Sequence, residues 1–362
     1  MLTNAPKGTK DIMMDQVYKW HYVEKKWKEI CARYGFKEIR TPIFEHTELF
    51  QRGVGDTTDI VQKEMYTFED HGGRSITLKP EGTSPAVRAF IEHKQYAEVQ
   101  PIKLYYDIPC FRYEKPQSGR LRQFHQFGVE TFGTTNMVAD AEIIAIGYDF
   151  LTSMGVTDLT LEINSVGCPE CRAKHRKALK DFLAPKYDQL CDTCKSRYEK
   201  NPMRILDCKS PIDQELVQGA PMMVDFLCDD CKNAFEDLQK NLDALEIPYV
   251  INPKIVRGLD YYTKTAFEFV TNSLGAQGTV CGGGRYDNLV EEVGGPPIPG
   301  VGFGLGKERL LMLMEANGVE IPKPSDCDVF IATMGEAAKL YGQKLLFNLR
   351  RNGIKCQIDD LQ

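Results

Sequence analysis

Apolar and polar residues alternate along two runs between residues 110 and 133, and a short charged loop joins the runs. A period of two is typical of β-strands, so the pattern predicts an antiparallel hairpin. Arg112 and Glu114 share one face of the first run, and Gln126 and Glu130 share one face of the second. A glycine stands between the last two. The hairpin therefore predicts a polar surface with open space above it.

The loop of this hairpin is basic. It contains Lys115, Arg120 and Arg122 and no acidic residue from 115 to 122. A basic loop above a polar surface favours an anionic partner. A half-exposed hairpin with ordinary surface charge is the alternative interpretation of the same pattern.

The first 50 residues predict a helix and a strand. Apolar residues recur every three or four positions over 15–34, which predicts an amphipathic helix that ends at Gly35. The run 36–50 predicts a short strand. Pro42 within it cannot donate to a sheet ladder, so we expect an edge strand. Such an edge either forms a subunit interface or is covered within the monomer.

A tight turn joins the next strand to a helix. Residues 75–78 predict the strand, and Ser84 as N-cap with Pro85 in the first helical position predicts the helix start. Glu81 and Thr83 fall in the turn between them. A carboxylate and a hydroxyl placed there can bind an ammonium group, or they can simply cap the helix.

The chain from 248 to 270 predicts strands interrupted at Gly258. Arg257 and Tyr262 differ in parity, so they face one site only if the backbone turns between them. Glu268 lies in the strand that follows.

Two glycine clusters follow, at 282–284 and 300–306, and the second leads into a helix that carries Arg309. Glycines allow a ligand or another backbone to approach closely. Neither cluster matches a phosphate-binding loop or a dinucleotide fingerprint. A nucleotide bound here would need arginines and a metal ion to hold its phosphates.

Composition limits the class of protein. The chain has 362 residues, a net charge of −6 and a pI of about 5.7, so a nucleic-acid surface must be a local patch. It contains no apolar run of the roughly 20 residues that span a membrane and no signal-peptide pattern at its start. Twelve cysteines then indicate reduced thiols or a metal, and we expect a cytoplasmic protein.

Seven of these cysteines lie between 168 and 231. The pairs Cys168/Cys171 and Cys191/Cys194 are 19 residues apart, which is the spacing of a structural zinc site. The three remaining cysteines leave the pairing open, and buried reduced thiols are the alternative. Residues 172–204 hold ten basic and four acidic residues, which indicates either a phosphate-binding surface or a solvated helix face.

The last segment, 326–362, predicts one strand–helix–strand unit after a proline-containing linker, with the right-handed crossover that such units adopt.

Taken together, these stretches resemble the histidyl-tRNA synthetases, a family of class II aminoacyl-tRNA synthetases, over nearly the whole chain. The three class II motifs are similar to the first helix with 40–42, to 111–130 and to 302–309. Two further stretches, 257–262 and 283–287, resemble the signatures of the histidine enzymes.

The resemblance implies an α+β fold: a class II catalytic domain, with an antiparallel sheet flanked by helices, that carries a Cys-rich insertion. It implies catalytic parts at 1–167 and 249–319, the insertion at 168–248, and the start of an incomplete α/β anticodon-binding domain at 326–362. It also implies a homodimer formed through the first motif.

The implied reaction is activation of L-histidine by ATP with Mg²⁺ and transfer of the histidyl group to tRNA(His). Arg112 and Arg257 would be catalytic. The ATP-binding set would be Arg112, Glu114, Glu268 and Arg309, with Glu268 near the Mg²⁺. The histidine-binding set would be Glu81, Thr83, Arg112, Gln126, Glu130, Arg257, Tyr262 and Tyr286. The tRNA-binding set would be Lys115, Gln117, Arg120 and Arg122. Zinc is not implied by the resemblance and rests on Cys168, Cys171, Cys191 and Cys194 alone.

Two alternatives compete. A regulatory subunit of ATP phosphoribosyltransferase, in histidine biosynthesis, resembles the same catalytic domain without being a synthetase. The presence of Arg112, Arg257 and Arg309 favours the enzyme. A zinc-dependent RNA-binding module would explain the insertion but not these arginines.

Overall fold

The computed structural model describes residues 3–55, 58–117, 119–208, 210–273 and 278–359. They form two compact units. One comprises Met1–Ile12 and Val23–Val319, and the other comprises Met13–Tyr22 and Glu320–Gln362.

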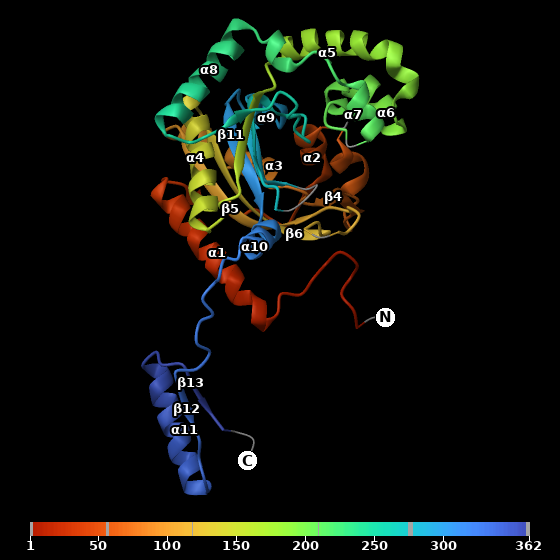
Figure 1. Cartoon of the computed structure of the whole chain (residues 1–362). Helices are drawn as coiled ribbons and strands as arrows, with labels where there is room; N and C mark the ends of the chain where they lie inside the picture. The colour runs from red at the N-terminus through yellow and green to blue at the C-terminus, as the bar shows by residue number, and fades with distance from the viewer. Residues whose placement is uncertain (1–2, 56–57, 118, 209, 274–277, 360–362) are drawn as a thin grey trace. The chain divides into compact units, whose positions relative to one another are not determined.

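An eight-stranded mixed sheet is the centre of the larger unit, which has an α+β fold (Figure 1). Its six central strands are antiparallel, and each edge adds one short parallel strand. In spatial order the strands are β1 (Lys37–Glu38), β5 (Ile102–Phe111), β6 (Gln123–Phe132), β11 (Gly300–Gly306), β10 (Thr279–Arg285), β9 (Thr263–Val270), β7 (Thr160–Ser165) and β8 (Val250–Ile251). The predicted hairpin is confirmed as β5 and β6, which pair from Ile102 with Phe132 to Phe111 with Gln123. The first run was predicted to continue through Glu114, but β5 ends at Phe111, so Arg112 and Glu114 follow the strand and do not lie in it.

The predicted strand over 36–50 is wrong in extent. The chain leaves the main sheet after β1 and passes Pro42 without pairing. It then joins a three-stranded sheet as β2 (Phe44–His46), beside β4 (Ser75–Leu78) and β3 (Tyr66–Glu69). Helix α2 (Thr47–Val54) follows at once. The ladder with β5 ends near Ile39, and Pro42, which has no N–H to donate, lies between the two sheets.

Helices cover both faces of the main sheet. Figure 1 shows α4 (Met137–Ser153) on one side and α2 with α3 (Thr83–Glu92) on the other. On the α4 side, Trp27 of α1 (Met14–Arg33) stacks on Phe127 with ring centroids 5.1 Å apart. On the α3 side, Phe90 stacks on Phe132 at 4.5 Å. These aromatic contacts hold the strands that carry the polar face.

Helix α3 begins at Thr83, and not at the predicted Pro85. The carboxylate of Glu81 accepts hydrogen bonds from the backbone N–H groups of Thr83 and Ser84, each at 2.7 Å. The carboxylate thus satisfies two N–H groups that have no partner within the helix. With Glu81 in this capping role, the helix begins before Ser84.

Among the described residues between β7 and β8, all regular elements are helices, and α5, α6 and α7 lie away from the sheet (Figure 1). Its elements are α5 (Pro169–Leu183), η3 (Ala184–Gln189), α6 (Asp192–Lys200), η4 (Pro202–Ile205), α7 (Pro211–Leu216), η5 (Met223–Phe226) and α8 (Asp229–Ala244). The remaining elements of the larger unit are η1 (Ile60–Glu64), η2 (Gln95–Ala97), α9 (Leu289–Glu292) and α10 (Lys307–Ala316).

The smaller unit contains the predicted strand–helix–strand order. Strands β12 (Val329–Ile331) and β13 (Cys356–Ile358) pair in parallel and are joined by α11 (Glu336–Arg351).

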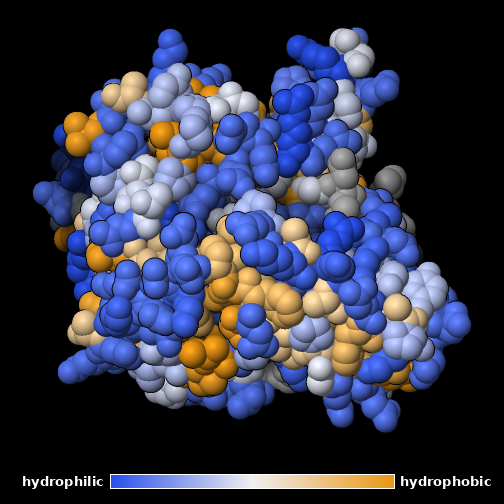
Figure 2. Space-filling model, turned by 90° about the horizontal axis from the view of Figure 1, so that it is seen from above, coloured by the Kyte–Doolittle hydropathy of each residue, from blue (hydrophilic) through white to orange (hydrophobic). Residues whose placement is uncertain are grey.

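Hydrophilic residues cover most of the face in Figure 2, and hydrophobic residues show between them in one broad area. Among the described helices, none has the length and apolar content needed to cross a bilayer.

Candidate active site

Three arginines from distant parts of the chain line one cavity of about 360 Å³. Arg112 follows β5, Arg257 precedes β9, and Arg309 lies in the first turn of α10. Seven other residues predicted for the site line the same cavity: Glu81, Thr83, Glu114, Arg120, Gln126, Tyr262 and Glu268. Glycines 282, 304 and 306 complete its wall and keep it open.

Arg112 is fixed by the turn that precedes α3. Its Nε donates to the carbonyl oxygen of Pro80 at 2.8 Å, and its guanidinium lies 5.2 Å from the ring centroid of Phe124. Its Nη1 is 3.9 Å from Glu114 Oε1. The planar end of the side chain is thereby held at the cavity wall.

Arg257 forms an ion pair with Glu268 inside the cavity. The backbone bends and turns over 258–261, which brings Arg257 and Tyr262 to one site as their parity requires. Burial acts to lower the pKa of Arg257, but Tyr262 and Glu268 raise it more, so the guanidinium stays charged. Its buried Nε has no hydrogen-bond partner among the described residues. A charged group with a spare donor is suited to an anionic ligand.

Arg309 reaches the cavity from the helix side, where its Nη1 donates to the carbonyl oxygen of Thr279. Burial lowers the pKa of Arg309, and the neighbouring Arg120 and Arg112 lower it further. Positive charges gathered in a concave site favour the binding of a polyanion.

Glu130 is fully buried and accepts hydrogen bonds from two tyrosines. The hydroxyl of Tyr106 donates to its Oε1 at 2.9 Å, and the hydroxyl of Tyr286 donates to its Oε2. Burial raises the pKa of Glu130 to about 8, although the hydroxyls of Tyr286, Thr83 and Tyr106 act against the rise. The group is therefore poised to hold or release a proton near neutral pH.

The open space predicted above Gly128 is filled by the ring of Tyr106. A Cβ on Gly128 would lie 2.2 Å from that ring, and the two residues are paired in the β5–β6 ladder. Tyr106 was not predicted as a site residue. The signal for it was the glycine itself, because a glycine within a strand marks a close approach by a neighbour.

The other predicted residues have smaller roles in the geometry. Both oxygens of Glu81 are occupied by the α3 N–H groups, and the Gln126 amide oxygen accepts from the Cys110 thiol at 3.4 Å. Sequence reasoning missed several residues that also line the cavity. They are Leu121, Phe124, Leu259, Tyr261, Thr279 and Glu308.

The basic loop is linked to the site through Glu114. Arg120 Nη1 lies 3.2 Å from Glu114 Oε2, and Arg122 Nε donates to the Glu114 carbonyl oxygen at 3.3 Å. Lys115 and Gln117 are exposed. Residue 118 of this loop lies outside the described residues.

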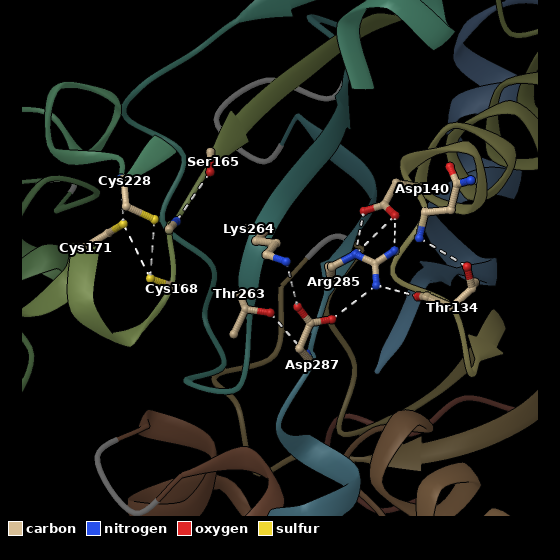
Figure 3. Close-up of polar contacts among 12 residues, drawn as sticks. Thr134, Asp140, Ser165, Cys168, Cys171, Cys228, Thr263, Lys264, Arg285 and Asp287 are labelled. Carbon is tan, nitrogen blue, oxygen red and sulfur yellow. Dashed lines mark hydrogen bonds and ion pairs between the residues drawn. The ribbon is translucent and has the colours of Figure 1, made fainter. Parts of the chain in front are cut away.

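The predicted zinc quartet is not formed, because its two pairs belong to different clusters. Cys168 and Cys171 meet the third pair, Cys228 and Cys231. Figure 3 shows the sulfurs of Cys168, Cys171 and Cys228 turned toward one another. Spacing shows which cysteines chelate as a pair but not which pairs the fold brings together.

Cys191 and Cys194 instead meet Cys208 and Asp213. In each of the two clusters, all candidate ligand atoms lie within 4.8 Å of one another, so each cluster could hold a metal ion. In the first cluster, burial acts to raise the pKa of Cys168, but hydrogen bonds from the backbone of Cys171 and neighbouring groups lower it to about 7.

Comparison with known proteins gives a consistent result. The model of the family described as "Histidyl-tRNA synthetase" matches residues 8–310. The histidine–tRNA ligase of Caldanaerobacter subterraneus subsp. tengcongensis is 61% identical over 362 residues, which is 100% of this chain and 87% of that protein. That of Clostridioides difficile is 59% identical over 363 residues, or 100% of this chain and 86% of that one.

Solved structures agree. The apo histidyl-tRNA synthetase of S. aureus superposes with a TM-score of 0.83 at 44% identity, covering 99% of this chain and 85% of that one. A Bacillus halodurans protein described as an ATP phosphoribosyltransferase regulatory subunit/histidyl-tRNA synthetase gives a TM-score of 0.72 at 23% identity, covering 100% of this chain and 93% of that one. At that identity the likeness shows the fold alone.

Proposed function

The chain belongs to the histidyl-tRNA synthetase family, and we propose that its activity as an aminoacyl-tRNA ligase takes place in the cavity lined by Arg112, Arg257 and Arg309. The carboxylate of L-histidine attacks the α-phosphorus of ATP. The bond to the bridging oxygen breaks, and histidyl-adenylate and pyrophosphate result. A terminal ribose hydroxyl of tRNA(His) then attacks the histidyl carbonyl, and AMP leaves.

The observation that carries this proposal is the meeting of three guanidinium groups in one cavity, whose wall also contains the buried carboxylate of Glu81. The attacking group of the first step is already an anion, so the step needs neutralisation and in-line positioning, not a general base. Arginines supply both, since a planar guanidinium can hold two oxygens at once.

Each arginine has a separate role in the proposal. Arg112 joins the histidine carboxylate to the α-phosphate, because its hydrogen bond to Pro80 places it next to the turn that carries Glu81 and Thr83. Arg257 contacts the α-phosphate with its guanidinium group, which lines the cavity. Arg309 holds the γ-phosphate, and Glu114 lies beside the same nucleotide.

Glu268 is the residue placed to hold Mg²⁺. Its carboxylate lies in the cavity wall between Arg257 and the hydroxyl of Thr279, which donates to Glu268 Oε2 at 2.7 Å. When bound with ATP, Mg²⁺ neutralises charge on the β- and γ-phosphates. The Arg257–Glu268 ion pair keeps the two groups oriented until the ligands take their place.

The imidazole of histidine is recognised by Glu130 and Tyr286, with Tyr262 beside them. Glu130 lies inside the fold with the hydroxyls of Tyr106 and Tyr286 on its two oxygens, and a ring N–H would add one more hydrogen bond there. A side chain that lacks a ring donor would forgo this bond and bind less well. Thr83, Gln126 and Glu81 lie where they can hold the amino group and the neighbouring atoms.

For tRNA we propose that the acceptor end meets the loop residues Lys115, Gln117, Arg120 and Arg122. The basic helices of the insertion, over 172–204, would contact the acceptor arm. An enzyme that acts on tRNA during protein synthesis is expected in the cytoplasm. The structural zinc predicted from the sequence belongs to the insertion, and no step of the reaction passes through it.

A homodimer is supported by the three-stranded sheet. Phe44 and Phe68 on one face are about half exposed (54% and 48%). On the opposite face, Thr47 and Thr67 both hydrogen-bond to the hydroxyl of Thr77 inside the fold. Exposed phenylalanines on one face of a small sheet indicate a protein interface. Replacing both with Glu should give a monomer by light scattering; an unchanged mass would place the interface elsewhere.

The regulatory-subunit alternative is less well supported. The curated ligases quoted above are about 60% identical over the whole chain, whereas the structure described as a regulatory subunit/synthetase is 23% identical. The deciding experiment is histidine-dependent exchange of pyrophosphate into ATP. Exchange supports the ligase, and histidine binding without exchange would support the regulator.

A further inference from the structure

We propose that the insertion binds two structural zinc ions at separate sites. One site is formed by Cys168, Cys171, Cys228 and Cys231, and the other by Cys191, Cys194, Cys208 and Asp213. The inference does not depend on amino-acid activation, because both sites lie among the insertion helices and not in the cavity.

The sulfur spacing of the first site fits a tetrahedral zinc site. Cys168 Sγ lies 3.5 Å from Cys171 Sγ and 3.9 Å from Cys228 Sγ (Figure 3). Four sulfurs about 2.3 Å from a tetrahedral ion stand about 3.8 Å apart. A disulfide would bring two sulfurs to about 2.05 Å. The thiols are therefore gathered at the distance a shared ion sets.

The local backbone supports thiolates at both sites. Cys168, Cys191 and Cys228 each occupy the N-cap of a helix, and the second cysteine of each pair lies in its first turn. The N–H of Cys228 donates to Cys171 Sγ at 3.1 Å. Helix N-termini and N–H donors stabilise negative sulfur, and metal-bound thiolates generally have such donors.

The second site contains a buried carboxylate. Asp213 is fully buried, its Oδ1 accepts from the N–H of Cys191 at 3.1 Å, and its Oδ2 lies 3.1 Å from Cys208 Sγ. Among the described residues, no lysine, arginine or histidine forms an ion pair with it. A buried carboxylate among three thiols is costly unless a cation joins them.

The two ions would stabilise different parts of the insertion. The first site ties the start of α5, the first helix after β7, to the start of α8, the last helix before β8. The second ties α6 to the residues before and within α7. Each site offers four protein ligands, which is typical of a closed structural zinc site and leaves no open position for catalysis.

The buried core around the first site is small and rich in sulfur, which is consistent with this role. Around the first site the fully buried hydrophobic residues are Cys171, Met223 and Cys231. A metal commonly replaces hydrophobic packing where the core is this small.

The test is metal analysis of the full chain, purified without chelator. We expect two zinc ions per chain in the parent. Cys171→Ala and the isosteric Asp213→Asn should each retain one, and their combination none. Cys327→Ser, which changes a cysteine outside the insertion, should retain two. Replacement by Co²⁺ should give a weaker thiolate-to-metal absorption band in C171A than in D213N, because the remaining site has three thiolates instead of four.

If C171A does not fold, titration of the parent with a mercurial reagent replaces it and should release two zinc ions as seven insertion thiols react. One ion per chain, lost in D213N but not when Cys171 is replaced, would overturn the first site. One ion lost only when Cys171 is replaced would overturn the second. No metal would overturn both sites, and a disulfide within one cluster by mass spectrometry would overturn that site.

Discussion

The hydroxyl of Tyr286 donates a hydrogen bond to the buried carboxylate of Glu130. The next residue back along β10, Arg285, is itself fully buried and is bound by Asp140, by Asp287 and by the carbonyl oxygen of Thr134 (Figure 3). These contacts fix the position of Arg285 and so restrict the backbone of the adjacent Tyr286. The pocket proposed for imidazole depends on this anchored pair.

We expect histidine affinity to show a bell-shaped pH dependence. Burial raises the pKa of Glu130 to about 8, while a free imidazole has a pKa of about 6.5. The complex of Glu130 and imidazole is most stable with one shared proton. Between pH of about 6.5 and about 8 the separate groups already carry one proton in total, because Glu130 is protonated and imidazole is neutral. Below the range, binding must release a proton. Above it, binding must take one up, so affinity falls about tenfold per pH unit on each side.

Calorimetric titration with histidine from pH 5.5 to 9.5 measures this curve. Glu130→Gln has nothing to titrate, so it should lose the fall at high pH while keeping the fall below about 6.5. A curve in the parent that stays flat up to pH 9.5 would contradict the role of Glu130.

Gly302 and Gly304 provide a matched pair of substitutions in β11. A Cβ on Gly302 would lie 1.9 Å from Glu130 Oε2 and 2.3 Å from the carbonyl oxygen of Val129, and that backbone cannot move away. A Cβ on Gly304 would meet the end of the flexible Gln126 side chain at 2.0 Å. We expect Gly302→Ala to abolish histidine binding and lower the melting temperature. Gly304→Ala should weaken histidine binding without abolishing it and with little loss of stability, because it displaces Gln126 and leaves Glu130 in place.

Thermal melts with and without histidine measure both the stability of each variant and its ability to bind histidine. Gly147→Ala is a suitable control, because it also adds a methyl group but its tightest contact is 3.0 Å, to the ring of Phe269 on the other side of the sheet. Equal losses of histidine affinity and melting temperature in the two β11 variants would contradict this prediction, because the clash with Glu130 would then matter no more than the clash with Gln126.

Arg257→Ala should reduce histidine-dependent pyrophosphate exchange by about 10²–10³-fold, as is typical when one donor to developing charge is removed. The variant also leaves Glu268 without its ion-pair partner. We therefore expect Arg257→Lys to recover Mg²⁺–ATP binding but little of the exchange rate, because a lysine cannot hold two oxygens in one plane. Arg74→Ala, at an exposed arginine paired with Asp70, is the control. Exchange within threefold of the parent would refute the role.

Asp140→Asn should lower the free energy of unfolding by about 3–5 kcal/mol, because it removes the fully buried carboxylate paired with Arg285 and leaves that arginine only the partly exposed Asp287. Urea unfolding followed by near-UV circular dichroism measures the change. Glu170→Gln breaks the exposed pair with Lys174 and should cost under about 1 kcal/mol. Since Tyr286 follows Arg285, histidine affinity should fall with D140N even where the protein remains folded.

Much of the fold could be predicted because local patterns match the final environment. The hairpin of β5 and β6 was predicted from its alternation, and residues such as Phe127 pack on the side where the alternation places them. The run 36–50 could not be assigned in this way. Its apolar residues serve two sheets and a helix, and only tertiary pairing decides where one element ends.

The candidate site was predictable where residue type implies chemistry. Arginines and carboxylates near glycines identified most of the cavity wall, whereas Tyr106 was hidden within an apolar strand. Its role depends on Gly128 of the paired strand, and pairing registers are not written in either segment alone. The predicted grouping of the cysteines was wrong for the same reason, since Cys168 and Cys228 meet only in the folded insertion.

Lys115→Ala should weaken tRNA(His) binding roughly fivefold, the loss expected from about one phosphate contact, and leave pyrophosphate exchange unchanged. Lys115 is exposed in the loop beside Glu114 and does not line the cavity. The dependence of log affinity on log salt should become shallower by about 0.7–0.9, because one fewer counterion is released.

Arg120→Ala is expected to affect both steps, since it also removes the ion-pair partner of Glu114 in the cavity wall. Lys240→Ala on α8 is the control for loss of a surface charge. Filter binding across a salt series with parallel exchange assays would distinguish the variants, and an unchanged salt slope in K115A would exclude Lys115 from the tRNA interface.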